Sequence, residues 1–191
     1  MRSARWPVLY GRLLLAGTLF AVAAGAQEPR PEVTFSASRE GELVNVFGTV
    51  QLPVAPRIAW SVLTDYEGYP RFISQVKESR VIARNDTGVV LQQRGEFGIL
   101  FLKQTLESRL LVTEQAQRIV LARSIEGPLR DFHGRYELEP VPGGVRLTYH
   151  GRFVPDFDLP PFIGMAALRY SLRKNFQEMT EEIMARGQRP E

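Results

Sequence analysis

The sequence predicts an α+β domain in which consecutive antiparallel strands precede one long C-terminal helix. Apolar and polar residues alternate in several segments between residues 44 and 153, and turn signals such as Asn85-Asp-Thr-Gly88 separate them. From Met165 onward the apolar residues instead recur every three or four positions, which is typical of a helix. The 191 residues, 44% of them hydrophobic, show no repeat or linker and suffice for one domain with a sizeable core.

Residues 1–26 have the pattern of a cleaved export signal. Three arginines precede an apolar run over residues 13–24, and Ala24-Gly25-Ala26 supplies the small residues that a signal peptidase requires. The apolar run is shorter than the roughly 20 residues that span a bilayer, which favours cleavage before Gln27 over an uncleaved anchor. We therefore expect a periplasmic or secreted protein.

Composition narrows the possible functions further. Without residues 1–26 the chain has 21 Lys and Arg and 21 Asp and Glu residues, so it is formally neutral. No dense basic stripe with interleaved aromatic residues remains, which argues against a nucleic-acid partner. The absence of cysteine excludes a disulfide scaffold, a thiolate nucleophile and Cys-ligated metal sites. We assign residues 27–41 to a flexible N-terminal segment, 42–186 to the domain and 187–191 to a frayed tail.

A strand and a short helix begin the domain. Alternation predicts the strand over residues 44–52, and Pro56 fits the first turn of a helix with its apolar residues on one side. A break over residues 66–70 ends that helix, and residues 71–74 form one more turn. We expect the remaining strands at residues 76–84, 89–97, 100–112, 119–125, 132–138 and 145–153. In the segment 119–125 both alternating sets are apolar, so its inward side stays open.

The last two strands can be aligned through their side chains. If Glu139 faces Gly144 across the turn, one side of the pair carries only apolar, aromatic and glycine residues, namely Phe132, Gly134, Tyr136, Leu138, Val145, Leu147, Tyr149 and Gly151. The other side pairs opposite charges and places His133 opposite His150. A shift by one residue would mix the two sides, so we expect one dry concave face and one wet face.

The longest periodic segment lies near the C-terminus. Asp158 could cap its N-terminus, and Pro160 or Pro161 fits the first helical turn. Steps of three and four place six apolar residues on one side of a helix of about six turns. They are Met165, Leu168, Leu172, Phe176, Met179 and Ile183. We expect this side to lie across the concave face of the sheet.

Several local strings, in their order and spacing, resemble one family. They are Leu63-Thr-Asp-Tyr-Glu-Gly-Tyr-Pro-Arg-Phe-Ile73, Ile125-Glu-Gly127, Phe132-His-Gly-Arg-Tyr-Glu-Leu138, Val145-Arg-Leu-Thr-Tyr149 and Pro155-Asp-Phe-Asp-Leu-Pro-Pro-Phe162. Over about residues 42–184 the chain resembles the polyketide cyclase/dehydrase and lipid-transport family (START-like, SRPBCC superfamily), most closely its coenzyme Q-binding START-like branch. The resemblance implies a helix-grip fold with two short helices after the first strand. It also implies a cavity between sheet and C-terminal helix that holds a lipophilic molecule.

Few polar groups are expected inside such a cavity. Gln93, Gln104 and the hydroxyls of Tyr136 and Tyr149 would suit orienting a quinone or a carbonyl-bearing lipid, and Arg169 could reach a head group at the mouth. The expected apolar lining is Phe132, Leu147, Met165, Leu172 and Phe176. Each of these residues has an alternative role. The polar groups could bond to the backbone or to water, the arginine could extend into solvent, and the apolar side chains could pack in the core.

No catalytic motif accompanies the predicted fold. The sequence contains no Gly-x-Ser-x-Gly elbow, no phosphate-binding loop and no dinucleotide-binding glycine motif. His133 and His150, with Asp131 nearby, would form half of a metal site, but a stable site requires three or four ligands. We therefore expect neither a metal nor a cofactor.

These observations favour an exported, noncatalytic binding or carrier protein for a hydrophobic small molecule, such as an isoprenoid quinone or another lipid. A polyketide cyclase/dehydrase-like enzyme is an alternative, with Tyr136, Tyr149 or Arg169 polarising a carbonyl. A protein-interaction domain with a filled core is a second alternative. Two apolar stretches, residues 97–102 and 157–163, could form a rim for transient contact with a membrane surface.

Overall fold

An antiparallel sheet and a long C-terminal helix dominate the described part of the chain. The computed structural model describes residues 31–99, 102–157, 159–160 and 163–189, without the side chains of residues 97–99 and 102–103. The strands are β1 (Thr34–Glu40), β2 (Leu43–Leu52), β3 (Val76–Asn85), β4 (Gly88–Ile99), β5 (Leu102–Gln115), β6 (Ile119–Glu126), β7 (Leu129–Val141) and β8 (Gly144–Pro155). The helices are α1 (Pro56–Leu63), η1 (Tyr66–Gly68), α2 (Tyr69–Phe72) and α3 (Gly164–Gly187). The α+β architecture expected from the sequence is confirmed.

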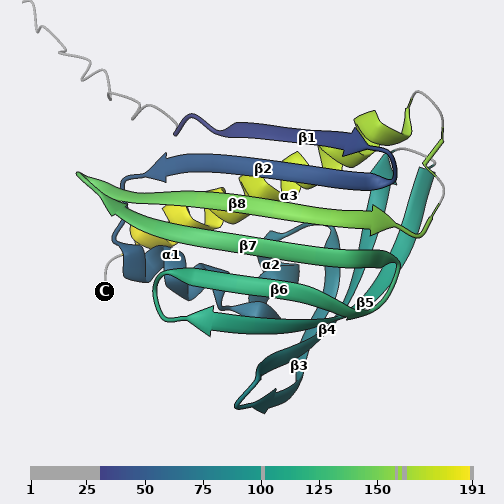
Figure 1. Cartoon of the computed structure of the whole chain (residues 1–191). Helices are drawn as coiled ribbons and strands as arrows, with labels where there is room; N and C mark the ends of the chain where they lie inside the picture. Colours follow the sequence, from purple (N-terminus) through teal and green to yellow (C-terminus); the bar gives the residue numbers. More distant parts are fainter. Residues whose placement is uncertain (1–30, 100–101, 158, 161–162, 190–191) are drawn as a thin grey trace, which may run out of the picture. The chain divides into compact units, whose positions relative to one another are not determined.

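Helix α3 covers one face of the sheet, which we call the inner face. The strands follow the order β1-β2-β8-β7-β6-β5-β4-β3, and α3 contacts β1, β2, β4 and α1. Figure 1 shows α3 crossing behind β1, β2 and β8, with the opposite, outer face of the sheet toward the viewer. Phe176, Met179 and Ile183 of α3 are buried in the main apolar cluster together with Leu147 of β8.

The alternating pattern determines which residues enter this core. In β2, Val44, Val46, Gly48, Val50 and Leu52 are buried, while the residues that alternate with them are exposed or half-buried. Strand β6, whose inward side the sequence left open, points Val120 and Ala122 inward, and these residues belong to the main cluster. Helix α1 begins at a proline and buries its apolar side, as expected.

The register of β7 and β8 differs from the expected one by two residues. Pro142 and Gly143 alone form the turn, so Val141 faces Gly144 and Glu139 faces Arg146. Gly143 has a φ of 80°, which favours glycine at this tight turn. A shift by two preserves the side on which each residue points, so the expected dry and wet faces are present although the expected pairs are wrong.

The N-terminal part of the domain also differs from the expectation. Residues 34–40, placed in a flexible segment, form the edge strand β1, which pairs with β2 and directs Phe35 and Ala37 toward the core. Helix α3 begins at Gly164, after Pro160. The expected export signal over residues 1–26 and the expected cap Asp158 lie outside the described residues. Among the helices described here, none combines the length and apolarity needed to span a membrane.

Candidate ligand-binding cavity

A cavity of about 290 Å³ lies between the inner face of the sheet and α3. Its lining is mainly apolar and aromatic, with Phe132 and Tyr136 from β7, Tyr149 and Phe153 from β8, and Leu172 from α3. Strands β4, β5 and β6 add the aliphatic side chains Leu91, Leu110, Val112 and Val120. The curved sheet and the helix therefore leave unfilled space where both present apolar residues.

Two glycines provide space for the aromatic side chains. Gly134 of β7 faces Gly151 of β8 across the strand pair. A Cβ atom on Gly151 would lie 2.6 Å from Tyr149 Oη, and one on Gly134 would lie 2.9 Å from Phe132 Cζ. Both distances are shorter than van der Waals contact, so alanine at either site would displace a ring that lines the cavity. Each ring thus lies over the glycine of its own strand, Tyr149 over Gly151 and Phe132 over Gly134.

Tyr136 and Tyr149 form a pair inside the cavity. They face each other across β7 and β8, with ring centroids 4.6 Å apart and ring planes inclined by 37°. Burial raises the pKa of Tyr149 to about 12, and burial together with the neighbouring Tyr149 and Tyr69 raises the pKa of Tyr136 well above its ordinary value. Both phenols are therefore protonated at neutral pH. Neither hydroxyl has a hydrogen-bond partner among the described residues, so both can donate to a ligand.

Ser171 and Asn175 of α3 add two buried polar atoms to the lining. Ser171 Oγ and Asn175 Oδ1 have no hydrogen-bond partner within the described chain, although both residues border the cavity. A helical serine commonly donates to the carbonyl of the preceding turn, and an unpartnered buried polar atom costs about 1–3 kcal/mol. Sequence reasoning missed both residues. Their positions, three residues after Leu168 and Leu172, place polar groups on the apolar side of the helix, and this was the available signal.

The cavity reaches the surface beside charged residues. Gln75, Arg94 and Glu96 line this opening, and each is partly exposed. Arg94 forms an ion pair with Glu78. The hydrogen bond and the charge of Arg94 hold the pKa of Glu78 below its ordinary value. Glu96 lies 3.6 Å from the ammonium of Lys77. The opening is therefore polar and carries charges of both signs, in contrast to the apolar interior.

Half of the ten residues expected to bind a ligand lie in this cavity. They are Gln93, Phe132, Tyr136, Tyr149 and Leu172. Gln93 Nε2 donates to Ser79 Oγ at 3.0 Å, so its amide already has one protein partner. Strand parity and helical spacing placed these five side chains on the inner face, and the structure brings them together.

The other five lie outside the cavity lining. Leu147 and Phe176 are fully buried in the core, where sheet and helix meet without a gap. Met165 packs on the second apolar cluster, under β1 and β2. Gln104 is exposed near the start of β5. Arg169 donates from Nε to the carbonyl oxygen of Ala37 at 3.0 Å, so it binds α3 to β1 rather than reaching the cavity mouth.

The cavity residues can bind and polarise a ligand, but they do not form an acid–base pair. Its described lining contains no histidine or aspartate, and Glu96 is at the opening. His133 and His150 lie on the outer face, as expected, but they do not face each other: His133 faces Arg152 and His150 faces Arg135. Within the described residues, no cluster of three His, Cys, Asp or Glu side chains could hold a metal ion.

The curved sheet around one long helix, with a cavity between them, defines a START-like α+β domain. Residues 52–180 match the family model described as "Polyketide cyclase / dehydrase and lipid transport". The chain therefore belongs to this family. No curated protein matches the chain by sequence.

Solved structures with the same fold include an enzyme and a lipid transfer protein. The Zhui aromatase/cyclase from Streptomyces sp. R1128 is 16% identical with a TM-score of 0.61, and the match covers 77% of this chain and 94% of that one. A START superfamily protein from Mycobacterium smegmatis is 17% identical with a TM-score of 0.56, covering 75% and 96%. A STAR-related lipid transfer protein from Xanthomonas axonopodis is 14% identical with a TM-score of 0.55, covering 78% and 98%. At these identities the likeness shows the fold alone.

Proposed function

We propose that this chain is an exported binding or carrier protein that holds a hydrophobic small molecule between the sheet and α3 without transforming it. The cavity itself carries the proposal, because apolar walls surround the unpartnered polar atoms of Ser171 and Asn175. Burial of apolar ligand surface would supply most of the affinity, at about 25 cal/mol per Å² before the costs of association. The family description and the lipid transfer protein of the same fold support this class of ligand.

The specific ligand that we propose is an isoprenoid quinone, with other lipids of similar head group as the wider class. A cavity of about 290 Å³ is small for a ligand site, which favours a compact ring inside and a tail leaving through the opening beside Gln75. Quinone carbonyls would accept hydrogen bonds from Tyr136 and Tyr149, and the hydroxyl of the reduced form would donate to Asn175 Oδ1. Ser171 Oγ would likewise donate to an oxygen of the head group, whereas Asn175 Oδ1 would gain a partner only from the reduced form.

A cyclase or dehydrase is the second candidate, and the tyrosine pair is the observation that favours it. Two protonated phenols whose ring centroids lie 4.6 Å apart could polarise a substrate carbonyl. Such an enzyme would also require a group that accepts a proton, and the described lining offers only Glu96, at the opening. We therefore place this function second.

Export and membrane contact belong to the same proposal. The pattern of residues 1–26 supports export, and export would give the carrier access to lipids of the outer side of a membrane. Ile163 is 46% exposed at the start of α3, and the half-buried Leu159 precedes it. These apolar residues would support transient contact with the membrane from which a lipid is drawn.

Mass spectrometry of copurifying molecules tests the proposal directly. The full chain would be expressed in a bacterium, purified without detergent and extracted with organic solvent. We expect a stoichiometric quinone or lipid from the wild-type protein. Leu172→Trp, which fills the cavity, should lose the ligand, whereas Arg173→Trp, on the exposed side of the same helix, should retain it.

Two results would contradict the carrier function. If wild-type protein copurifies with nothing and takes up neither added quinones nor fatty acids, the cavity is not a lipid site. If a polyketide-like substrate is instead cyclised or dehydrated, and Tyr136→Phe with Tyr149→Phe abolishes turnover while binding persists, the protein is an enzyme. Thermal unfolding of each variant would confirm that loss of ligand is not loss of fold.

A further inference from the structure

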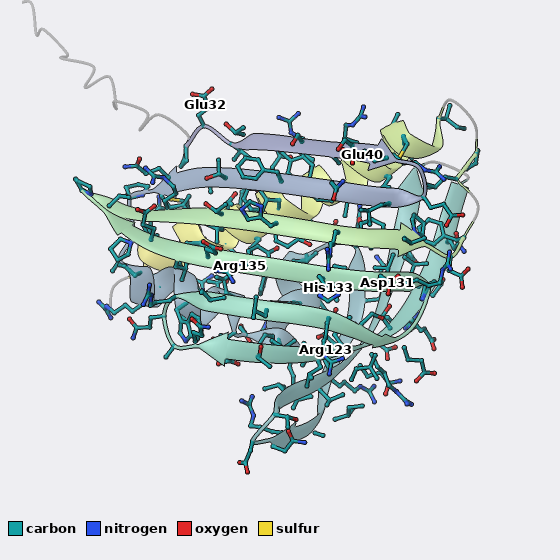
Figure 2. The ribbon with its side chains drawn as sticks, in the orientation of Figure 1. Glu32, Glu40, Arg123, Asp131, His133 and Arg135 are labelled. Atoms are coloured by element: carbon teal, nitrogen blue, oxygen red, sulfur yellow. The ribbon has the colours of Figure 1, made fainter. Side chains whose placement is uncertain are left out.

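A second hollow, of about 630 Å³, lies on the outer face of the sheet. We call it the outer groove. Two rows of directly paired residues cross it from β1 to β6. The first row is Ser38, Asn45, Arg152, His133 and Arg123. The second row, two residues away on each strand, is Ser36, Phe47, His150, Arg135 and Leu121. All ten residues line the groove, and Figure 2 shows Arg123, His133 and Arg135 near one another on this face.

Basic side chains are concentrated in these rows. Arg123 and Arg152 are exposed and have no carboxylate partner among the described residues. Arg135 is paired with Glu137 on its own strand. Asp131, which Figure 2 places beside His133, is exposed and forms no ion pair within the described residues. Because residues 27–191 carry equal numbers of acidic and basic residues, this concentration is local and does not reflect the overall charge.

The first row places two arginines on either side of a histidine. Arg152, His133 and Arg123 lie on three neighbouring strands, about 4.8 Å apart in the direction of pairing, so His133 is between the two arginines. An anion held between the two guanidinium groups would be stabilised by both, since arginine binds phosphate and carboxylate through paired, charge-assisted hydrogen bonds.

The second row adds an apolar surface beside the cations. Phe47 contacts His150 edge to face, with ring centroids 5.2 Å apart, and Leu121 lies at the far end of the row. Ser36, Ser38 and Asn45 supply hydrogen-bonding groups at the β1 end. We propose that the outer groove binds an amphiphilic anion, in which a phosphate or carboxylate contacts Arg123 and Arg152 and an aromatic or apolar body lies on Phe47 and Leu121.

The shape of the groove favours a soluble molecule over a membrane surface. A volume of about 630 Å³ is within the range of small-molecule sites. A flat layer of lipid head groups would contact the rim of such a hollow and leave its floor unfilled. The site is separate from the ligand cavity, because the sheet lies between them. Only the two small residues Gly134 and Ala122 border both.

Phenyl phosphate and inorganic phosphate are the probes that test this inference. Backbone amide NMR of the isotope-labelled full chain at low ionic strength would give the binding site and the dissociation constant of each. We expect shifts centred on β6, β7, β8 and β2, and about two- to tenfold tighter binding of phenyl phosphate, since an aromatic contact contributes about this much. Added salt should weaken both, because the site is exposed.

Three variants separate the parts of the site. Arg123→Gln with Arg152→Gln should weaken both probes by about tenfold or more, because charge-assisted hydrogen bonds are lost. Phe47→Ala should remove the advantage of phenyl phosphate while inorganic phosphate binds as before. Arg146→Gln is the matched control, since Arg146 lies on β8, faces outward and is outside the groove.

Several outcomes would overturn the inference. Shifts scattered over all surface arginines, or an equal effect of Arg146→Gln, would show nonspecific attraction to anions. Binding to vesicles of phosphatidylglycerol and phosphatidylcholine that depends on Arg123 and Arg152, without binding of phenyl phosphate, would identify a membrane surface instead. Because Arg123, Arg146 and Arg152 are exposed, unchanged thermal unfolding is expected of the arginine variants and would exclude misfolding as the cause. Phe47 is half-buried, so the retained binding of inorganic phosphate is the control for Phe47→Ala.

Discussion

Ser171 has a buried hydroxyl without a partner, so its removal should affect the empty and the ligand-bound protein in opposite directions. We predict that Ser171→Ala raises the free energy of unfolding of the ligand-free protein by about 1 kcal/mol, because an unsatisfied buried polar group is removed. The copurifying ligand should bind about five- to tenfold more weakly, because it loses a hydrogen-bonding group. Urea denaturation and a binding titration measure the two effects.

Thr180 provides the control on the same helix. It is also buried, but its Oγ1 donates to the carbonyl oxygen of Gln177 at 2.8 Å. Thr180→Val should therefore lower the free energy of unfolding by about 1 kcal/mol and leave ligand affinity unchanged. If Ser171→Ala also destabilises the empty protein, or if ligand affinity does not change, Ser171 has only a packing role.

Gly151 is the residue whose small size admits the Tyr149 ring. A Cβ atom there would lie 2.6 Å from Tyr149 Oη, so Gly151→Ala should move the ring and lower the free energy of unfolding by about 1–3 kcal/mol. Ligand should be lost as well. Adding Tyr149→Phe removes the nearest of the contacted atoms and leaves ring carbon Cζ at 2.9 Å, so the double variant should regain part of the stability. Additive losses in the double variant would show that the clash does not involve the hydroxyl.

At the scale of elements, an ion-paired arginine connects the segment after α1 with the end of α3. Arg186 donates to Asp65 Oδ2 at 2.6 Å and to Glu182 Oε1 at 2.7 Å, and its guanidinium lies 5.6 Å from the centre of the Phe72 ring. Burial raises the pKa of Asp65, but the bonds and charges of Arg186 and Arg71 outweigh it. The pKa of Asp65 is therefore lower than its ordinary value of 3.8.

The ion pair of Arg186 with Asp65 should stabilise the fold only at pH values at which Asp65 is ionised. Because the pKa of Asp65 is lower in the folded state than in the unfolded state, its contribution is fully present above about pH 4 and is lost as the pH falls through the folded value. We predict that Asp65→Asn costs about 1 kcal/mol at pH 7, and that this difference shrinks by pH 3. Urea denaturation at both pH values tests it, with exposed Asp86→Asn as the control. A difference that is constant with pH would contradict this origin.

Arg169 joins α3 to the edge strand through one hydrogen bond to Ala37. We predict that Arg169→Gln increases amide hydrogen exchange in β1, because the strand loses its bond to the helix. Ligand affinity should change less than about twofold, since Arg169 lies outside the cavity lining. A large loss of affinity with unchanged exchange in β1 would instead restore the role that the sequence had predicted for this arginine.

The sequence predicts the sides of the strands better than their pairing. Alternation placed Gln93, Tyr136 and Tyr149 on the inner face because a strand has a period of two, and a two-residue error in register leaves that period intact. The pairing itself depended on the length of the turn at Pro142 and Gly143. A sequence pattern also cannot distinguish apolar residues that pack in contact from those that leave a gap. The predicted cavity lining therefore included the core residues Leu147 and Phe176 as well as the true lining residues Phe132 and Leu172.

Over the whole molecule, the two faces of one sheet have different chemistry. The inner face and α3 enclose an apolar cavity, whereas the outer face concentrates arginine and histidine in a chain that is neutral after residue 26. Alternation along β6, β7 and β8 produces both faces from the same segments. Two ligands of different polarity could therefore occupy the protein at once, with one layer of backbone between them.

Export is a property of the whole chain, and it determines which lipids the cavity could meet. We predict that the full chain expressed in a bacterium is recovered outside the cytoplasm with Gln27 as its first residue, because Ala24 and Ala26 fit the cleavage site. Intact-mass measurement and N-terminal sequencing test this. Replacing both alanines with leucine should leave a longer, membrane-associated precursor. A cytoplasmic protein that begins at Met1 would contradict export, and the carrier would then have to draw its ligand from the inner side of the membrane, although the cavity and its tests would stand unchanged.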